Sequence, residues 1–562
     1  MGFVFRSDEK KGWPLPLQRA FGRTAEPWLD FDPARTRAAV GRAAAATANP
    51  LASWAALTVL RAGGCAVDAA VATQAVLTLV EPNASGVGGG AVMLVHDGGA
   101  VRCYDGLSTA PARAPTRLLT DFDGRTVPAD RAIYGGRTVG VPGALRALEV
   151  AHRRHGRLSW SELFDPAIEL AEDGFPLAPY LWRTLQENPA MRDEPMAGAL
   201  YCGGGSGTLL PGSTLRNAAL ARTLRRVADG GADAFYGGEI AAAICQVVRA
   251  DPFPGTITLA DMAEYRAVER TPLHFPLGAM SVVTGALPCY GGIAAGQITG
   301  VLAAFGVTGL GHALTLEETH LLSEAGRVAF ADRAPYADPD HHPMDAAALL
   351  DPGYLAERAR LIDRHRRADR IKVRAASGAS QTSHVCIADG DGQVVSMTTT
   401  LNQNFGARIS VGGFYLNNVM TNFATDRPEK NHPNAIAPGK RARTTIGPSI
   451  VLGADGRPVA AIGAGGGYRI IGYLANGLLR LAGGERDPQA IVAAPHALNW
   501  SGVTEIEPEL RLHTAELVAR GHWVTMRRLD GGTQCVVRDD AGWRAAGDPR
   551  RDGAGMALSN GF

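Results

Sequence analysis

The sequence predicts an α+β protein in which β-sheets lie inside and helices pack around them. Amphipathic helical patterns dominate residues 143–350, whereas paired strand patterns dominate the chain from residue 382 onward. A polar stretch of small residues over 375–381 lies between these two regions. The 562 residues are enough for one large two-layer enzyme or for about two to four domains.

The first hundred residues predict an arm, two helices and a hairpin. Residues 1–35 are expected to form an irregular arm. From Pro50 the apolar spacing predicts a helix that stops at Gly63 and Gly64. The next stretch, VDAAVATQAVLTLV, is apolar nearly all round, which predicts a helix buried between layers. Two strand-like runs joined by a DGG turn at 97–99 then predict a hairpin.

The last third of the chain is richer in strand patterns. The stretch 384–401, HVCIADGDGQVVSMTTTL, predicts a strand, a turn and a second strand. Strand-like runs continue at 412–419 and 448–463, and helical patterns are interposed at 468–483 and 508–521. Helices around strands that pair as hairpins are typical of a layered α+β body.

The composition argues against several kinds of partner. The formal net charge is +1 without a basic stripe, so neither nucleic acid nor an anionic membrane is expected. The seven cysteines are scattered and never form a CxxC pair, so we expect neither a disulfide framework nor a thiolate metal site. We also expect no cofactor. His341 and His342, near Asp338 and Asp340, fit a polar loop better than a metal site, because adjacent histidines cannot share one face.

The sequence contains no pattern for membrane insertion or export. No apolar run reaches the length of a membrane span. Charges and prolines interrupt the apolar residues of 1–22, so no signal-peptide core can be drawn there. We therefore expect a cytoplasmic protein. Its expected partner is a small-molecule substrate.

Thr382 has the sequence context of a self-cleaving nucleophile. A flexible stretch, SGASQ, runs directly into a strand that begins with Thr382. Attack of the Thr382 hydroxyl on the carbonyl of Gln381 would form an ester, and water would then release a new N-terminus. The free α-amine, which titrates near a pKa of about 8, would accept the hydroxyl proton in later turnovers. His384 is then expected to be a packing or hydrogen-bonding residue.

Three further features support this hypothesis, and one of them is the pair of hydroxyls of Thr444 and Thr445 before Gly447 and Pro448. Thr398, Thr399 and Thr400 lie on a strand that can return beside Thr382. The glycines of 463–467 lie between a strand and a helix, where backbone amides can hold an oxyanion.

The glycine run at 86–91 matches the spelling of a dinucleotide-binding fingerprint. It follows a helix and precedes a strand, which is the reverse of the arrangement that binds phosphate. We therefore do not expect a dinucleotide site there.

Several long motifs, in one order from about Ala46 to the C-terminus, resemble the γ-glutamyltransferase family of transpeptidases and related acylases. The motifs are PLASWAALTVLRAGGCAVDAAVA, VEPNASGVGGG, GLSTAP, TVGVPG, LFDPAIELAEDGFP, ADRAPYADPD, TSHVCIADGDGQVVSMTTTLNQNFG, LNNVMTNF, GKRARTTIGPSIV and GAGGGYRII.

The resemblance implies a four-layer αββα sandwich of the N-terminal-nucleophile hydrolases, with additional helices from the large chain. It implies one precursor that is cut between Gln381 and Thr382 into a large chain, 36–381, and a small chain, 382–562. The two fragments remain together as one protomer, and a dimer of such protomers is an open alternative.

The family motifs also imply roles for four catalytic residues. Thr382 falls on the nucleophile and Thr400 on a supporting hydroxyl. Gly466 and Gly467 fall on the glycines of the oxyanion hole. We therefore expect these four residues to lie together in the fold.

Substrate contacts are implied for a second group of residues. Asn402 matches an asparagine that contacts the donor's amino group, and Thr444 and Thr445 match a pair of substrate-contacting serines. Two arginines are further candidates for binding a carboxylate: Arg408, in the loop after the strand that leads to Asn402, and Arg443. Surface arginines of this kind are more often solvated.

Three departures from the family pattern predict a changed donor pocket. Leu107 stands where family members that bind γ-glutamyl groups have an arginine for the α-carboxylate. Val419 and Asn422 replace the glutamine and the acidic residue of LNNQMDDF, the element that holds the α-ammonium group. Loss of such pairs costs about 2–5 kcal/mol each, so a glutathione-type donor is not expected.

These residues leave several functions to weigh. The first is a self-processed amidase or acylase for a small acyl amide that is not γ-glutamyl. The second is a hydrolase of a carbon–carbon bond next to a carbonyl, as in relatives from antibiotic pathways that build alkylproline units. A true γ-glutamyltransferase or glutathione hydrolase is a third. A non-catalytic binding protein with the precursor fold is the fourth, and retention of the threonines and glycines argues against it.

Overall fold

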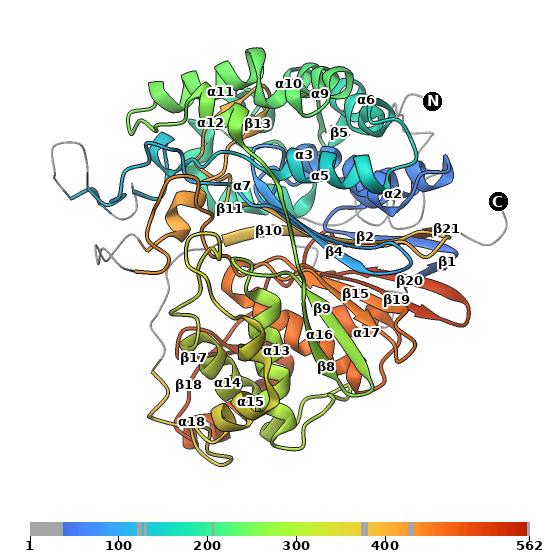
Figure 1. The fold of residues 1–562 in the computed structure, drawn as a ribbon, viewed down its shortest axis with the longest axis vertical. Coiled ribbons are helices and arrows are strands. Elements are labelled where there is room, and N and C mark those ends of the chain that lie inside the picture. The colour runs from blue at the N-terminus through green and yellow to red at the C-terminus, as the bar shows by residue number, and fades with distance from the viewer. Residues whose placement is uncertain are drawn as a thin grey trace.

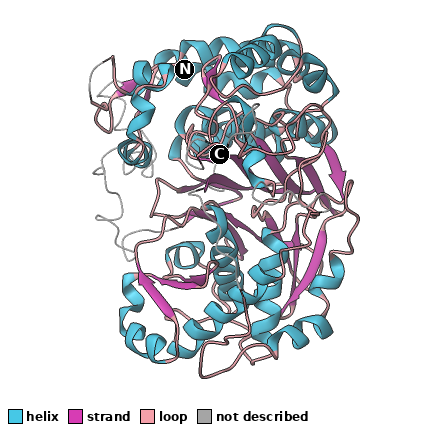
Figure 2. Ribbon diagram, turned by 90° about the vertical axis from the view of Figure 1, so that its left-hand side faces the viewer, coloured by secondary structure: helices cyan, strands magenta, loops and turns pink. Residues whose placement is uncertain are grey.

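A computed structural model describes residues 38–120, 126–128, 132–204, 207–372, 380–424 and 432–558. Within these residues, two large antiparallel sheets are stacked face to face, and helices cover the outer face of each sheet (Figure 1). The view in Figure 2 shows the same helix–sheet–sheet–helix order from the side. The predicted α+β four-layer sandwich is therefore confirmed, whereas the predicted arm at 1–35 lies outside the described residues.

The first sheet carries the predicted nucleophile and has seven strands. In spatial order they are β21 (Ala554–Leu558), β2 (Ala43–Thr47), β10 (Ser380–Ala388), β11 (Val394–Gln403), β3 (Gly90–His96), β4 (Val101–Gly106) and β7 (Val268–Arg270). Helices packed on its outer side include α2 (Pro50–Arg61), α3 (Ala66–Val80), α5 (Ala144–His155), α6 (Asp165–Asp173), α7 (Pro179–Glu187), α9 (Ala218–Gly230), α10 (Asp233–Tyr236), α11 (Gly238–Ala250) and α12 (Leu259–Glu264).

The second sheet also has seven strands. They are, in order, β1 (Ala39–Gly41), β20 (Gly542–Gly547), β19 (Thr533–Asp539), β15 (Pro458–Ala464), β14 (Ser449–Leu452), β9 (Met280–Thr284) and β8 (Leu273–Leu277). Its outer helices are α13 (Gly291–Ala303), α14 (Leu316–Ala331), α15 (Pro352–Ala359), α16 (Ile470–Ala482) and α17 (Pro488–Ala493). A small sheet of β16 (Ala497–Asn499), β17 (Val503–Ile506) and β18 (Trp523–Met526) lies beyond them with α18 (Thr514–Ala519).

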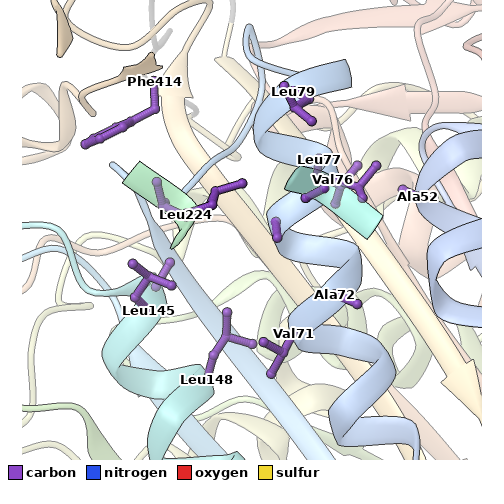
Figure 3. Close-up of a cluster of buried hydrophobic side chains, with 14 of the residues drawn as sticks. Ala52, Val71, Ala72, Val76, Leu77, Leu79, Leu145, Leu148, Leu224 and Phe414 are labelled. Atoms are coloured by element: carbon purple, nitrogen blue, oxygen red, sulfur yellow. The ribbon is translucent and has the colours of Figure 1, made fainter. Parts of the chain in front are cut away.

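Three apolar cores hold the layers together. Because successive side chains of a strand point to opposite faces of the sheet, neighbouring residues of one strand belong to different cores. On β10, Val385 and Ile387 point to the core under the helices, whereas Cys386 and Ala388 point to the core between the sheets. Figure 3 shows part of the first core, where side chains from α3, α5 and α9 meet. The predicted all-round burial of α3 is confirmed, because every one of its residues is buried.

The local predictions for residues 50–106 also hold. The side chain of Asn49 accepts a hydrogen bond from the Leu51 amide at 3.0 Å and caps α2, which ends just before Gly63. The turn at 97–99 joins β3 to β4, as expected for a hairpin. The strand predicted at 412–419 is wrong for most of its length: only β13 (Phe414–Tyr415) pairs there, followed by the 3₁₀ turn η8 (Val419–Asn422).

The β10–β11 hairpin is the centre of the first sheet. His384 pairs with Thr398, and the register shifts between Gln381 and Ser383. Such a bulge bends a strand and re-aims a side chain. Thr382 is the residue at this irregularity, so the local backbone differs from that of the regular strand that follows.

His384 fills the space between the sheets beneath this bulge. It is 0% exposed, and its Nδ1 lies 2.8 Å from the Thr398 hydroxyl. Burial lowers the pKa of His384 to about 3, so the imidazole is neutral. On β15, Gly463 leaves room for this ring, because a Cβ atom there would collide with the imidazole. His384 is thus a packing and hydrogen-bonding residue, as expected.

We predict that Gly463→Ala destabilises the protein by about 1–3 kcal/mol, because the added methyl group overpacks the space around His384. Thermal unfolding of the purified variant measures the effect. Gly99→Ala is the matched control, because the nearest atom to its added Cβ would be 3.8 Å away, on Asp97. Equal unfolding temperatures for the two variants would contradict the close approach of the sheets.

Candidate active site

Thr382 is the third residue of β10, where the two sheets approach each other. It is 1% exposed. Its hydroxyl oxygen is 3.2 Å from that of Thr400 on β11. Thr400 in turn donates a hydrogen bond of 2.9 Å to the carbonyl oxygen of Gln381. The predicted nucleophile, its supporting hydroxyl and the predicted scissile carbonyl therefore meet at one point.

The hydrogen bonds of Thr400 fix the direction in which protons are shared. A hydroxyl has one proton to donate and two lone pairs to accept with. Because the proton of Thr400 goes to the Gln381 carbonyl, the Thr382 hydroxyl must be the donor in the contact between the two threonines. The amide of Asn402 donates the remaining bond to Thr400, at 2.8 Å. Thr400 thus contacts the Gln381 carbonyl and the hydroxyl of the predicted nucleophile at once.

The glycine-rich turn after β15 lies against Thr382. A Cβ atom at Gly465 would collide with the carbonyl oxygen of Thr382, and the Gly465 amide donates to Gly532 at 3.1 Å. Gly466 has a φ of 119° and Gly467 a φ of 63°, conformations that favour glycine. Among the described residues, no hydrogen bond takes the amide of Gly466. This geometry allows the turn to present backbone N–H groups to an oxyanion.

Among the predicted substrate-contacting residues, Thr445 borders this turn, whereas Asn402 borders Thr400. The Thr445 hydroxyl donates to the Gly467 carbonyl at 3.0 Å, and Thr444 is equally buried beside it. Asn402 adopts a φ of 81°, and its side chain donates to the Thr421 hydroxyl at 2.9 Å. The structure therefore brings Asn402, Thr444 and Thr445 into the neighbourhood of the threonine pair.

Of the three residues predicted to depart from the family pattern, Leu107 and Val419 lie in apolar surroundings. Leu107 is 3% exposed and belongs to the core between the sheets. Val419 is 7% exposed and packs in a small apolar cluster with Met420 and Phe423. Asn422 follows on η8, where its backbone carbonyl accepts a hydrogen bond from Asn434. None of these three side chains can provide a charge to a substrate.

The two candidate arginines have different surroundings. Arg408 stacks on the ring of Tyr134 and donates to the Tyr134 hydroxyl at 2.8 Å and to Asn188 at 3.1 Å. These partners lie outside the cluster around Thr382. Arg443 directly precedes Thr444 and donates to the backbone carbonyl of Arg333 at 2.8 Å. Arg443 thus contacts the segment of Arg333, and Arg408 contacts Tyr134 and Asn188.

Sequence reasoning missed the polar residues beneath the nucleophile. The Arg551 guanidinium donates to the Thr382 carbonyl at 2.9 Å and to the Gln381 side chain at 2.7 Å. Ser383 contacts the carboxyl group of Glu81 at 3.3 Å, and burial raises the pKa of Glu81 to about 8. The only sequence signal for Arg551 is a pair of arginines between two aspartates near the C-terminus.

The described residues contain no cluster of three or more His, Cys, Asp and Glu side chains suited to a metal ion. Near the adjacent histidines, Asp338 instead accepts hydrogen bonds from Arg270 and from the Arg441 amide. Among the same residues, no helix is both long enough and apolar enough to span a membrane.

The four layers and the threonine at the start of a central strand are those of an N-terminal-nucleophile hydrolase. Residues 52–558 match the Gamma-glutamyltranspeptidase family. The chain therefore belongs to the γ-glutamyltranspeptidase family, as a proenzyme, which implies two chains formed by self-cleavage.

Individual relatives support the same assignment. The Acylase ACY 1 proenzyme of Pseudomonas sp. (strain SE83) is 34% identical over 97% of this chain and 98% of its own length. The Glutathione hydrolase proenzyme of Pseudomonas aeruginosa (strain PAO1) is 33% identical over 89% of this chain and 92% of its own. The crystal structure of cephalosporin acylase from Bacillus halodurans has a TM-score of 0.81 and 27% identity, covering 94% and 98% of the two chains.

We predict that Thr400→Val slows self-cleavage by roughly 100-fold, because the Gln381 carbonyl loses the donor that stabilises its developing oxyanion. The fraction of uncut chain, followed over time on denaturing gels, measures the rate. Thr400→Ser keeps the hydroxyl group and is expected to cleave within about tenfold of the wild type. Unchanged cleavage in the valine variant would show that this hydrogen bond does not act on the scissile carbonyl.

Proposed function

We propose that this proenzyme cuts itself between Gln381 and Thr382 and then uses Thr382 as an N-terminal nucleophile to hydrolyse or transfer an acyl group from a small amide. The observation that supports this proposal most strongly is the contact of Thr400 with both the Thr382 hydroxyl and the Gln381 carbonyl. A binding protein has no need for a hydroxyl that bridges these two groups.

Self-cleavage begins with attack of the Thr382 oxygen on the carbonyl carbon of Gln381. The bond from that carbon to the Thr382 nitrogen breaks, the hydroxyl proton passes to the nitrogen, and an ester remains. Water then hydrolyses the ester, giving a carboxylate on Gln381, the restored hydroxyl and a free α-amine on Thr382. The backbone irregularity at Thr382 fits this step, because it removes the residue from regular strand pairing.

Turnover repeats the same attack on an external amide. The free amine, with a pKa of about 8 in unperturbed chains, accepts the proton of the hydroxyl and passes it to the leaving amine. The amides of Gly466 and Gly467 stabilise the tetrahedral oxyanion, and water or another amine then takes the acyl group from Thr382.

The donor is proposed to differ from a γ-glutamyl group. Such a donor brings an α-carboxylate and an α-ammonium group, which require charged partners when they are buried. Leu107 lies in an apolar core and Val419 in an apolar cluster, and Asn422 carries no charge. Loss of a buried charged partner costs about 2–5 kcal/mol, so γ-glutamyl binding should be weak.

The catalytic role of Thr382 is tested by two substitutions. Thr382→Ala removes the nucleophile, so the variant should remain uncut and hydrolyse no acyl amide. Thr382→Ser keeps a hydroxyl and should retain both reactions at a lower rate. Mass spectrometry of the small chain, quenched during turnover, should show an acyl adduct. Full amidase activity in Thr382→Ala would contradict the proposal.

The prediction for the donor is tested with nitroanilide substrates. We expect kcat/KM for γ-glutamyl nitroanilide to be at least about 30-fold below that for the best acyl nitroanilide without an α-ammonium group. A panel of short acyl amides and of diketones compares amide with carbon–carbon bond hydrolysis. Efficient γ-glutamyl turnover would show that Leu107, Val419 and Asn422 do not exclude this donor.

A further inference from the structure

The small sheet is held against α14 by a chain of buried polar side chains. The chain contains His320 and Ser323 of α14, Asn499 and Thr504 of the small sheet, and His522 just before β18. Each of these five side chains belongs to a residue that is at most 2% exposed. Figure 1 shows α14 beside β17, β18 and α18 at the lower end of the molecule. The chain therefore crosses the boundary between the small sheet and the outer helices of the second large sheet.

Two histidines form the centre of this chain. Nδ1 of His320 lies 2.7 Å from Nε2 of His522, and the two rings meet edge to face with their centres 5.0 Å apart. Nε2 of His320 lies 2.8 Å from the carbonyl oxygen of Asp363. Nδ1 of His522 lies 3.0 Å from the Thr504 hydroxyl. All four ring nitrogens therefore have a hydrogen-bond partner.

The partner at one end fixes the direction of every hydrogen bond along the chain. The Asp363 carbonyl can only accept, so Nε2 of His320 carries a proton. In a neutral imidazole the other nitrogen accepts, so His522 donates from its Nε2 to Nδ1 of His320. Nδ1 of His522 then accepts in turn, and the Thr504 hydroxyl is its donor.

Thr504 has no capacity left for a further hydrogen bond. Since its proton goes to His522, its oxygen accepts from the Ser323 hydroxyl at 2.6 Å and from the Asn499 amide at 3.2 Å. A hydroxyl has one proton and two lone pairs, and all three are in use. The chain thus has one consistent arrangement, in which both histidines are neutral.

A proton taken up by either histidine breaks this arrangement. A proton on Nδ1 of His320 would point at the N–H group of His522 across 2.7 Å. A proton on Nδ1 of His522 would meet the Thr504 hydroxyl, whose lone pairs are both in use. An exchange of the donor and acceptor nitrogens of His522 would force Thr504 to give up an accepted bond. Loss of such a bond leaves a buried polar group without a partner, which is costly.

The cations around the pair also oppose a charge on His522. Burial is the main cause that lowers the pKa of His522 to about 3, and His320, Arg327, Arg367 and Arg520 lower it further. These arginines come from three separate segments: α14, the loop after α15, and the end of α18. Acid therefore places a proton on His522 more readily when the small sheet has moved away from them.

The acids near His320 are engaged elsewhere. Burial is the main cause that lowers the pKa of His320, whereas the nearby Glu324 and Asp363 raise it. Glu324 accepts from Arg327 at 2.6 Å, and Asp363 is paired with Arg366 at 3.1 Å. Neither carboxylate forms a hydrogen bond with the pair, so neither provides a place for an added proton.

We propose that the His320–His522 pair is an acid-sensitive latch, which holds the small sheet on α14 at neutral pH and releases it as the pH falls from 7 to 5. In the released form each histidine regains the ordinary pKa of about 6.5. Because the pKa values in the closed form are lowered, the latch is fully effective above pH 6.5 and weakens below it. The latch does not depend on self-cleavage, although α14 and the small sheet lie on opposite sides of the expected cut.

Hydrogen exchange of the full-length wild-type protein, followed by mass spectrometry, tests the latch. Protection is expressed relative to an unstructured peptide at the same pH. A histidine that takes up its proton only in the open form changes the opening equilibrium by up to about 25-fold between pH 7 and pH 5. Protection of residues 497–526 should therefore fall at least about tenfold over this range.

The helix α11 is the reference segment, because it contains no histidine and packs on the first sheet. Its protection should change by less than about threefold between the two pH values. Equal loss of protection in α11 and in 497–526, or constant protection of 497–526, would overturn the proposal.

Substitution tests the two histidines themselves. The double variant His320→Gln and His522→Gln keeps a donor and an acceptor at each position but cannot take up a proton. Its protection at 497–526 should therefore be nearly the same at pH 7 and pH 5. His365→Gln is the matched control, because His365 is an exposed histidine on the loop that supplies the Asp363 carbonyl. This control should keep the pH dependence of the wild type.

The double variant also separates the pair from the other histidines of this region. His496 packs against the ring of Tyr473, and Nδ1 of His513 lies 3.0 Å from the Thr319 hydroxyl. Both remain in the variant, so a pH dependence equal to that of the wild type would assign the effect to them and overturn the latch. If the variant is unprotected already at pH 7, the comparison of 497–526 with α11 in the wild type decides.

Discussion

The rest of the active site depends on the three hydrogen bonds of the Thr400 hydroxyl. Its proton goes to the Gln381 carbonyl, and it accepts from the Thr382 hydroxyl and from the Asn402 amide. This arrangement satisfies every hydrogen-bonding position of the group and leaves a lone pair of Thr382 free to attack. It also brings the proposed electrophile and the proposed nucleophile into contact with one residue on the neighbouring strand.

The layered fold provides the rigidity that these contacts need. Thr382 and Thr400 come from adjacent strands of one sheet, whereas the glycine turn comes from the other. His384 and Gly463 show how closely the two sheets approach beneath the site, because no side chain larger than hydrogen fits opposite the imidazole. A site built between two packed sheets holds its groups more precisely than a site built on loops.

Much of this could be predicted from the sequence, because the signals are local. The hairpin of β10 and β11, the buried helix α3 and the turn at 97–99 follow from apolar patterns and turn residues. Family motifs predicted catalytic roles for the two threonines and the glycines, and these roles stay predictions. The strand predicted at 412–419 is longer than the strand in the structure, where only β13 forms. Two glycines before β13 and two asparagines after it divert the backbone. Arg551 could not be found, since 169 positions separate it from Thr382 and only the fold brings them together.

The central claim is that the chain cuts itself where the Thr382 hydroxyl meets the Gln381 carbonyl. N-terminal sequencing and intact mass spectrometry of the purified wild-type protein test it most directly. The account predicts two chains, the smaller of which begins at Thr382. A single chain after prolonged incubation, or a small chain that begins at any other residue, would contradict it.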